Sequence, residues 1–243
     1  MIDFPFLYET TLELLDGIPL TLKLALSAVL CGLVLAALLA AMRLSGSRVL
    51  DGIARLYVTV FRGTPLLVQI FIIYYGLGQF SGLRASFVWP YLREPYWCAL
   101  LALSLNTAAY GAEIIRGGLV SVAHGQLEAA RAYGMTRFTT LRRVILPQAL
   151  RQMLPSYSNE VILMVKATAL ASTVTLLEVT GIAVRIISET YRTVEVFLSA
   201  AVIYLAINFI IVGAFRVFEY LLSPEKRAPK PVSGTPPRTS SHG

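Results

Sequence analysis

The feature that most restricts how this chain can fold is a set of five apolar stretches, each about twenty residues long. They cover residues 20–42, 65–83, 97–115, 157–177 and 197–215. A helix rises about 1.5 Å per residue, so it needs ~20 apolar residues to cross the ~30 Å hydrocarbon layer of a bilayer. We therefore predict an all-α integral membrane protein with five transmembrane helices.

The composition excludes a soluble helical protein with buried helices as the explanation. Hydrophobic residues make up 56% of the 243 positions and charged residues only 14%, whereas soluble domains are about a quarter charged. The first apolar stretch is not a signal peptide, because the residues before it are acidic where a signal peptide is basic. Those acidic residues are Asp3, Glu9, Glu13 and Asp16.

The distribution of Lys and Arg between the stretches predicts the orientation, because cytoplasmic loops retain positive charge. Thirteen of these residues fall on one side: Arg43, Arg48, Arg55, Arg131, Arg137, Arg142, Arg143, Arg151, Arg216, Lys226, Arg227, Lys230 and Arg238. Four fall on the other: Arg84, Arg93, Arg185 and Arg192. We expect a periplasmic N-terminus and a cytoplasmic C-terminus, and the net charge of +7 then follows from topology.

The chain divides into three parts on this basis. Residues 1–17 form a periplasmic segment, and residues 18–222 form the transmembrane domain with a large cytoplasmic loop at about 121–150. Residues 223–243 are rich in Pro, Ser and Gly, which predicts a disordered cytoplasmic tail. Within the domain we expect an amphipathic cytoplasmic helix over 51–61 and a break at 63–65, where Thr64 precedes Pro65 as a helix cap.

No sequence motif indicates catalysis, a metal or a cofactor. Cys31 and Cys98 lie in separate apolar stretches, and His124 and His242 cannot assemble a metal site by themselves. The phosphate-binding, nucleophile-elbow and zinc-protease patterns are missing from the sequence. We expect a protein that does not make or break covalent bonds.

The cytoplasmic loop contains "GQLEAARAYGMTRFTTLRRVILPQ", residues 125–148. Strong helix formers predict a short helix over 127–133, closed by Gly134 in the left-handed conformation. A second short helix is expected over 136–144, ended by Pro147. Two short helices joined at a glycine could bind a partner; alternatively, the loop is a solvated basic segment that only fixes the topology.

The spacing within this loop resembles the EAA motif of ABC-importer permeases. Glu128-Ala129-Ala130 is followed after three residues by Gly134, and after nine more by "VILP", in which only Val144 departs from the motif. The segments "FRGTPLLVQIFIIYYGLG" and "LPSYSNEVILMVKATAL" also resemble permeases of polar amino-acid uptake. The chain is most similar to the permease subunits for histidine, lysine, arginine and ornithine and for opines.

The resemblance implies a type I ABC-importer permease in the bacterial inner membrane that transports a polar, basic amino acid. Its partners would be a second permease subunit, identical or related, two ATPases and a periplasmic binding protein. In that family the EAA loop inserts into the ATPase, with Glu128 as a polar contact, Ala129 and Ala130 allowing close approach and Gly134 setting the turn. The alternative is a secondary transporter or channel, which would need paired carboxylates or an inverted repeat in the spans; the sequence contains neither clearly.

Lys166 is the charge that calls for an explanation in the apolar stretches. It lies nine residues into the fourth stretch, ~13 Å from its end, where a charge costs about 2.5–3.5 kcal/mol on insertion scales. It therefore needs water, substrate or a partner. Glu160 is a candidate counter-charge, but it lies six positions away on the same helix, which puts the two side chains on different faces. Glu113 is the alternative, although Arg116 competes for it at i+3. The three residues form either part of the translocation path or an internal ion pair.

Overall fold

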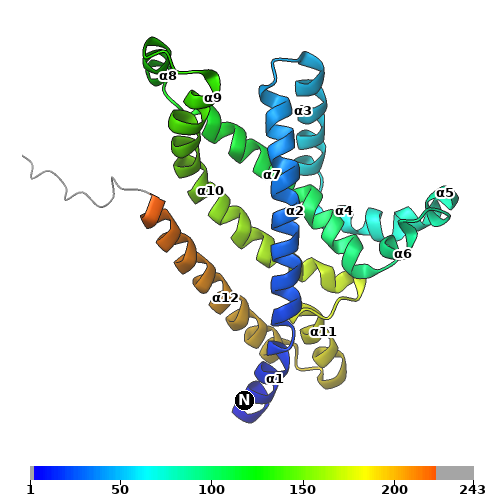
Figure 1. The fold of residues 1–243 in the computed structure, drawn as a ribbon. Helices are drawn as coiled ribbons and strands as arrows, with labels where there is room; N and C mark the ends of the chain where they lie inside the picture. The colour runs from blue at the N-terminus through cyan, green and yellow to red at the C-terminus, as the bar shows by residue number, and fades with distance from the viewer. Residues whose placement is uncertain (1–2, 223–243) are drawn as a thin grey trace, which may run out of the picture.

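The structure is a computed structural model that describes residues 3–222, and all regular elements in this range are helices. Figure 1 shows long, tilted helices that run the length of the molecule and short ones at its ends and side. The predicted tail, 223–243, lies outside the described residues. The helices are α1 (Phe4–Leu15), α2 (Ile18–Leu44), α3 (Arg48–Gly63), α4 (Leu66–Phe71), η1 (Ile72–Gly76), η2 (Leu77–Gln79), α5 (Ser81–Arg84), α6 (Trp89–Leu92), α7 (Pro95–Val120), α8 (His124–Ala132), α9 (Arg137–Thr140), η3 (Leu141–Ile145), α10 (Leu146–Ala167), η4 (Thr168–Val174), α11 (Val179–Thr190) and α12 (Thr193–Leu222).

Three helices within this range, α2, α7 and α12, are each long and apolar enough to cross a bilayer. Two further spans arise only from bent pairs: α3 with α4 to η2, bent by 104°, and the run from α9 to η4 with α11, bent by 46°. The described residues thus contain three to five candidate spans. The predicted span over 65–83 is not one continuous helix, because the helical path from α4 ends at Gln79 and is long enough to cross a bilayer only together with α3.

The break between α3 and α4 is held by side-chain amides. The Gln69 side chain donates to the carbonyls of Phe61 and Thr64 at 2.9 and 3.1 Å, and the Asn106 amide donates to Gln69 Oε1 at 3.0 Å. The carbonyls of Phe61 and Thr64 at the break are therefore satisfied inside the protein, as a membrane interior requires. The predicted break at 63–65 is confirmed, although Pro65 rather than Thr64 caps α4.

Helix α3 does not stand apart as a separate amphipathic helix. It packs against α2 and α7 through the buried residues Ala54 and Val58, and the Tyr57 hydroxyl donates to the Leu105 carbonyl at 2.8 Å. The predicted helix at 51–61 is present, and the two neighbouring helices cover Ala54 and Val58, whereas Ile53, Leu56 and Val60 stay exposed.

Small residues bring α2 and α7 close together at the centre of the fold. A Cβ built at Gly32 would lie 2.2 Å from Thr107 Cγ2, and one at Gly111 would lie 2.9 Å from Ala36 Cβ. Ala108 is fully buried in the same seam. Small side chains are the usual means by which membrane helices approach each other, so α2 and α7 form the rigid centre against which α3 and α10 pack.

A buried carboxylate joins the starts of α2 and α11 to α12. Glu178 is fully buried and caps α11 by accepting the backbone N–H groups of Thr180 and Gly181 at 3.0 and 2.8 Å. It also accepts the Tyr204 hydroxyl at 2.6 Å. Gly17 lies directly against this turn, since a Cβ there would be 2.5 Å from the Val179 nitrogen.

Ion pairs hold α1 against α11 and α12. Arg192 donates to Asp3 at 3.1 Å and lies 3.9 Å from the centre of the Phe6 ring, while Arg185 donates to Glu13 at 2.7 Å. The hydrogen bond from Arg192 lowers the pKa of the Asp3 carboxyl. Residues 1–17, expected to form a separate segment, therefore include a helix that is attached to the end of the bundle.

Candidate functional site

Helices α8 and α9 protrude at one end of the molecule, beyond the start of α10 (Figure 1). Helix α8 ends in a Schellman motif: Gly134 has φ +70°, its N–H donates to the Arg131 carbonyl at 2.9 Å, and the Met135 N–H donates to the Ala130 carbonyl at 3.0 Å. This pattern needs a left-handed residue after the cap, which glycine supplies at no steric cost. The predicted helix and its glycine turn are confirmed.

The four EAA residues present two different faces of α8. Ala130 is buried, and the helix rests on it, whereas Glu128, Ala129 and Gly134 are exposed. Next to them Tyr133 is 84% exposed. The outward face therefore combines a carboxylate, a small residue and an open glycine backbone, an arrangement suited to close approach by another protein.

Helix α9 begins where expected, because the Thr136 hydroxyl caps it by accepting the Thr139 N–H at 3.2 Å. The expectation that Pro147 ends it is wrong. The chain continues through the π turn of η3 into α10, and Pro147 sits in the first turn of α10, where its missing N–H costs little. The protruding part is thus 124–140, and residues 141–150 of the predicted loop form η3 and the start of α10.

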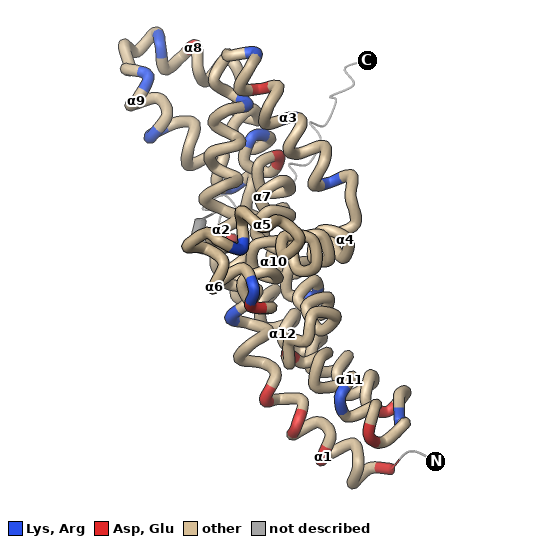
Figure 2. Tube along the Cα trace, turned by 90° about the vertical axis from the view of Figure 1, so that its right-hand side faces the viewer, with Lys and Arg blue, Asp and Glu red and all other residues tan. Residues whose placement is uncertain are grey.

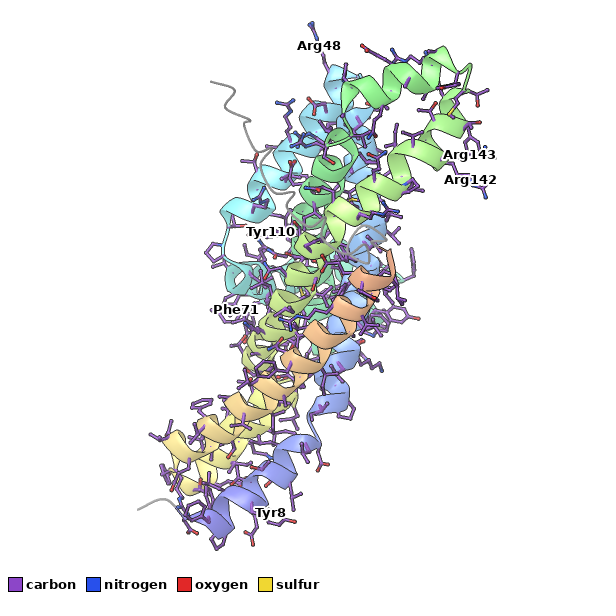
Figure 3. The ribbon with its side chains drawn as sticks, turned by 90° about the vertical axis from the view of Figure 1, so that its left-hand side faces the viewer. Tyr8, Arg48, Phe71, Tyr110, Arg142 and Arg143 are labelled. Carbon is purple, nitrogen blue, oxygen red and sulfur yellow. The ribbon has the colours of Figure 1, made fainter. Side chains whose placement is uncertain are left out.

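Charge is unevenly distributed along the molecule (Figure 2). Lys and Arg gather at the end that carries α3, α8 and α9, whereas α1 at the opposite end carries acidic residues and no basic ones. The exposed Arg142 and Arg143 continue the basic surface down the α9–α10 run (Figure 3).

The three ionisable residues predicted for the path or an ion pair are not brought together. Glu113 pairs with Arg43 and, at 2.8 Å, with Arg116, the competitor expected at i+3. Glu160 is buried and accepts the Thr107 hydroxyl at 2.8 Å.

Lys166 is exposed and has no charged partner within residues 3–222. It lies six positions after Glu160 on one helix, so the two side chains point to different faces. The internal ion pair is therefore not formed, and a role for Lys166 in the path stays a prediction.

Lys166 belongs to a polar stripe on α10 that the sequence reasoning missed. Its exposed polar members, Gln152, Ser156, Asn159 and Lys166, recur at helical spacing, and the exposed Leu163 is the apolar residue on the same line. The spacing i, i+4, i+7, i+11, i+14 could have been found by periodicity. A polar face on a membrane helix faces other protein or a water-filled path rather than lipid.

A cavity of 440 Å³ opens beside this stripe, between α3, α7 and α10. Its polar lining comes from Arg62, Tyr110, Glu113, Gln152 and Ser156. The Arg62 guanidinium lies over the Tyr110 ring, 5.0 Å from its centre. Arg62 could have been singled out from the sequence as an arginine between two apolar segments, just before the predicted break at 63–65, but its neighbours on α7 and α10 could not. The described residues contain no group of three or more potential metal ligands.

Residues 28–223 match the family described as binding-protein-dependent transport system inner membrane component. The octopine transport system permease protein OccM of Rhizobium meliloti is 64% identical over 222 residues, 91% of each chain. The histidine/lysine/arginine/ornithine transport system permease protein HisM of Salmonella typhimurium is 43% identical over 201 residues, 82% of this chain and 86% of that one.

Solved structures have the same fold. A chain described as belonging to an amino acid ABC transporter with histidines is 36% identical, with a TM-score of 0.80 over 90% of this chain and 99% of that one. An inward-facing MetNI methionine ABC transporter chain, 19% identical, covers 91% and 99% with a TM-score of 0.67, which supports the fold alone.

The helical fold, the protruding α8–α9 pair and these similarities define the permease subunit of an ABC importer, a transport component whose ATPase is a separate subunit. The chain belongs to the binding-protein-dependent transport system inner membrane component family and is a multi-pass protein of the bacterial inner membrane.

Proposed function

We propose that this chain forms the translocation path of an ATP-driven importer for arginine-type opines or basic amino acids. It acts with a second permease subunit, two ATPases and a periplasmic binding protein. The observation that carries the substrate class is the similarity to permeases named for octopine, nopaline and the basic amino acids. Octopine and nopaline are N-carboxyalkyl derivatives of arginine, so a cationic side chain and a carboxylate are common to most of these compounds.

The test of this function is uptake of radiolabelled octopine and L-arginine by proteoliposomes that contain the complete complex and enclose ATP. We expect uptake of at least one compound, dependent on ATP and on the binding protein. Uptake driven by a proton or sodium gradient without ATP would instead favour a secondary transporter.

The orientation we propose follows the charge distribution. The basic end with α3, α8 and α9 faces the cytoplasm, and α1 faces the periplasm, as the positive-inside rule favours. Each bent pair then counts as one span, which gives five spans, an external N-terminus and an internal C-terminus.

Reporter fusions should check this topology. A reporter joined after Leu222 should be found in the cytoplasm, and one joined before Thr10 should be found in the periplasm. A matched fusion within the α8–α9 loop should also be found in the cytoplasm. A periplasmic C-terminus would overturn the five-span arrangement.

We also propose that Lys166 lies on the translocation path, where it attracts a carboxylate of the substrate. Support comes from its exposure on the polar stripe of α10 and its lack of a charged partner among residues 3–222. Neither nearby acid competes for this lysine: Glu160 is buried against Thr107, and Glu113 pairs with Arg43 and Arg116.

A Lys166→Met variant is expected to lose at least about tenfold in uptake while the Tm of the complex stays the same or rises, because removing a charge from a membrane helix relieves its desolvation cost. Uptake and Tm would be measured in parallel. Lys23→Met is the control, since Lys23 lies near one end of α2 over the Tyr96 ring and should leave uptake intact. Normal uptake in a stable Lys166→Met complex would remove Lys166 from the path.

A further inference from the structure

Arg62 is a second cation in the membrane domain without a charged partner. It lies fourteen residues after Arg48, the start of α3, which places it ~21 Å along the helix from the basic end. No carboxylate within residues 3–222 lies within 4.0 Å of its guanidinium. A charge at such depth costs about 2.5–3.5 kcal/mol unless it faces water, protein charge or a ligand.

The Arg62 side chain is positioned by its neighbour on α7. The guanidinium lies over the Tyr110 ring at 5.0 Å, and Figure 3 shows Tyr110 at the middle of the molecule, far from Arg48 at its end. Stacking uses the face of the guanidinium and leaves its N–H edges available. Those edges match a carboxylate in a bidentate arrangement.

The other polar groups that line the cavity are uncharged or already paired. Gln152 and Ser156 line it from α10. Glu160, one helical turn beyond Ser156, is buried against Thr107 and does not line the cavity. Glu113 on the opposite side is already neutralised by Arg43 and Arg116.

The cavity therefore offers one cation, Arg62, that has no charged partner among residues 3–222. Its volume of 440 Å³ falls in the range of small-molecule sites, about 300–1,000 Å³. We propose that the Arg62 guanidinium binds a carboxylate of the transported amino acid or opine in this cavity. This inference rests on the proposed import of such compounds. The Arg62 contact lies on α3 and is separate from the contact proposed for Lys166 near the end of α10.

Equilibrium binding to the purified permease–ATPase complex in nanodiscs, without the binding protein, tests the site directly. The probes are radiolabelled L-arginine, octopine and agmatine, which keeps the guanidinium of arginine but lacks its carboxylate. For wild type we expect L-arginine or octopine to bind at least about tenfold more tightly than agmatine. Arg62→Gln should weaken the binding of the carboxylate-bearing probe at least about tenfold, because a charge-assisted bidentate contact is lost. The affinity for agmatine should stay unchanged.

Two further variants separate binding from folding. Arg62→Lys should recover part of the affinity, since it keeps the charge but not the planar fork. Arg48→Gln, on the same helix but at its exposed end, should bind all probes as wild type does. The Tm of the Arg62→Gln complex should not fall, whereas a purely structural arginine predicts a lower Tm.

The outcomes distinguish this inference from the function on which it rests. If wild type binds and imports neither carboxylate-bearing probe, the proposed function fails and the site fails with it. If wild type binds one of them and Arg62→Gln binds it equally well, only the Arg62 site is overturned. An Arg62→Gln complex that binds agmatine and the carboxylate-bearing probe with equally reduced affinity, or that fails to assemble, also contradicts a carboxylate contact.

Discussion

Uptake is expected to fall to background in a Gly134→Asp variant that still inserts into the membrane. Gly134 has φ +70°, and no atom lies within 4 Å of a Cβ built there. The strain of a left-handed non-glycine residue is only about 1–2 kcal/mol, too little to unfold the subunit. A complete loss of uptake must therefore come from a partner that approaches this backbone closely, which is the role we propose for the ATPase.

The measurements are ATP-dependent uptake and the amount of ATPase that co-purifies with the permease. Glu128→Lys, on the same exposed face, should reduce both in the same way. Gly46→Asp is a matched control, because Gly46 has φ +75°, equally open space and a position at the same end of the molecule but outside α8. If Gly134→Asp transports as Gly46→Asp does, the α8–α9 pair is only a basic loop that fixes the topology.

A Gly17→Ala variant should lower the Tm of the complex by about 5–10 °C, which corresponds to about 3 kcal/mol of overpacking. A Cβ at this position would lie 2.5 Å from the Val179 nitrogen and 2.8 Å from the Glu178 carbonyl carbon. These are backbone atoms that cannot rotate away. The start of α2 must then move off α11, which weakens the bond from the Val179 N–H to Thr21 Oγ1, now 3.3 Å.

Thermal unfolding of the purified complex measures this effect. Gly52→Ala is the control, since Gly52 lies within α3 with no atom within 4 Å of its would-be Cβ. A helix gains stability from alanine in place of glycine, so the Tm of this control should be unchanged or slightly higher. Equal Tm values for the two variants would contradict the close packing of α2 on α11.

The sequence alone determined the class of protein and the short helix and glycine turn of the cytoplasmic loop. Long apolar stretches without compensating polar surface leave a bilayer as the only suitable solvent, and the Glu128 to Gly134 spacing encodes a short helix with its closing turn. Both are local properties: a run of about twenty residues spans a membrane by itself, and a glycine after a helix closes it by itself. The resemblance to importer permeases, confirmed by the family match over 28–223, rests on the same local motifs.

The tertiary structure decided the features that depend on neighbouring helices. Whether Pro147 ends a helix depends on the π turn before it, and whether residues 65–83 form one span depends on amides from α4 and α7. Periodicity places Glu160 and Lys166 on different faces of one helix, but it cannot place Glu113, which lies on another helix. The partners that the two glutamates have in the structure, Arg43 for Glu113 and Thr107 for Glu160, come from other helices. The Arg62 cavity likewise joins residues from α3, α7 and α10, since pairing across helices is set by packing in three dimensions rather than by spacing along the chain.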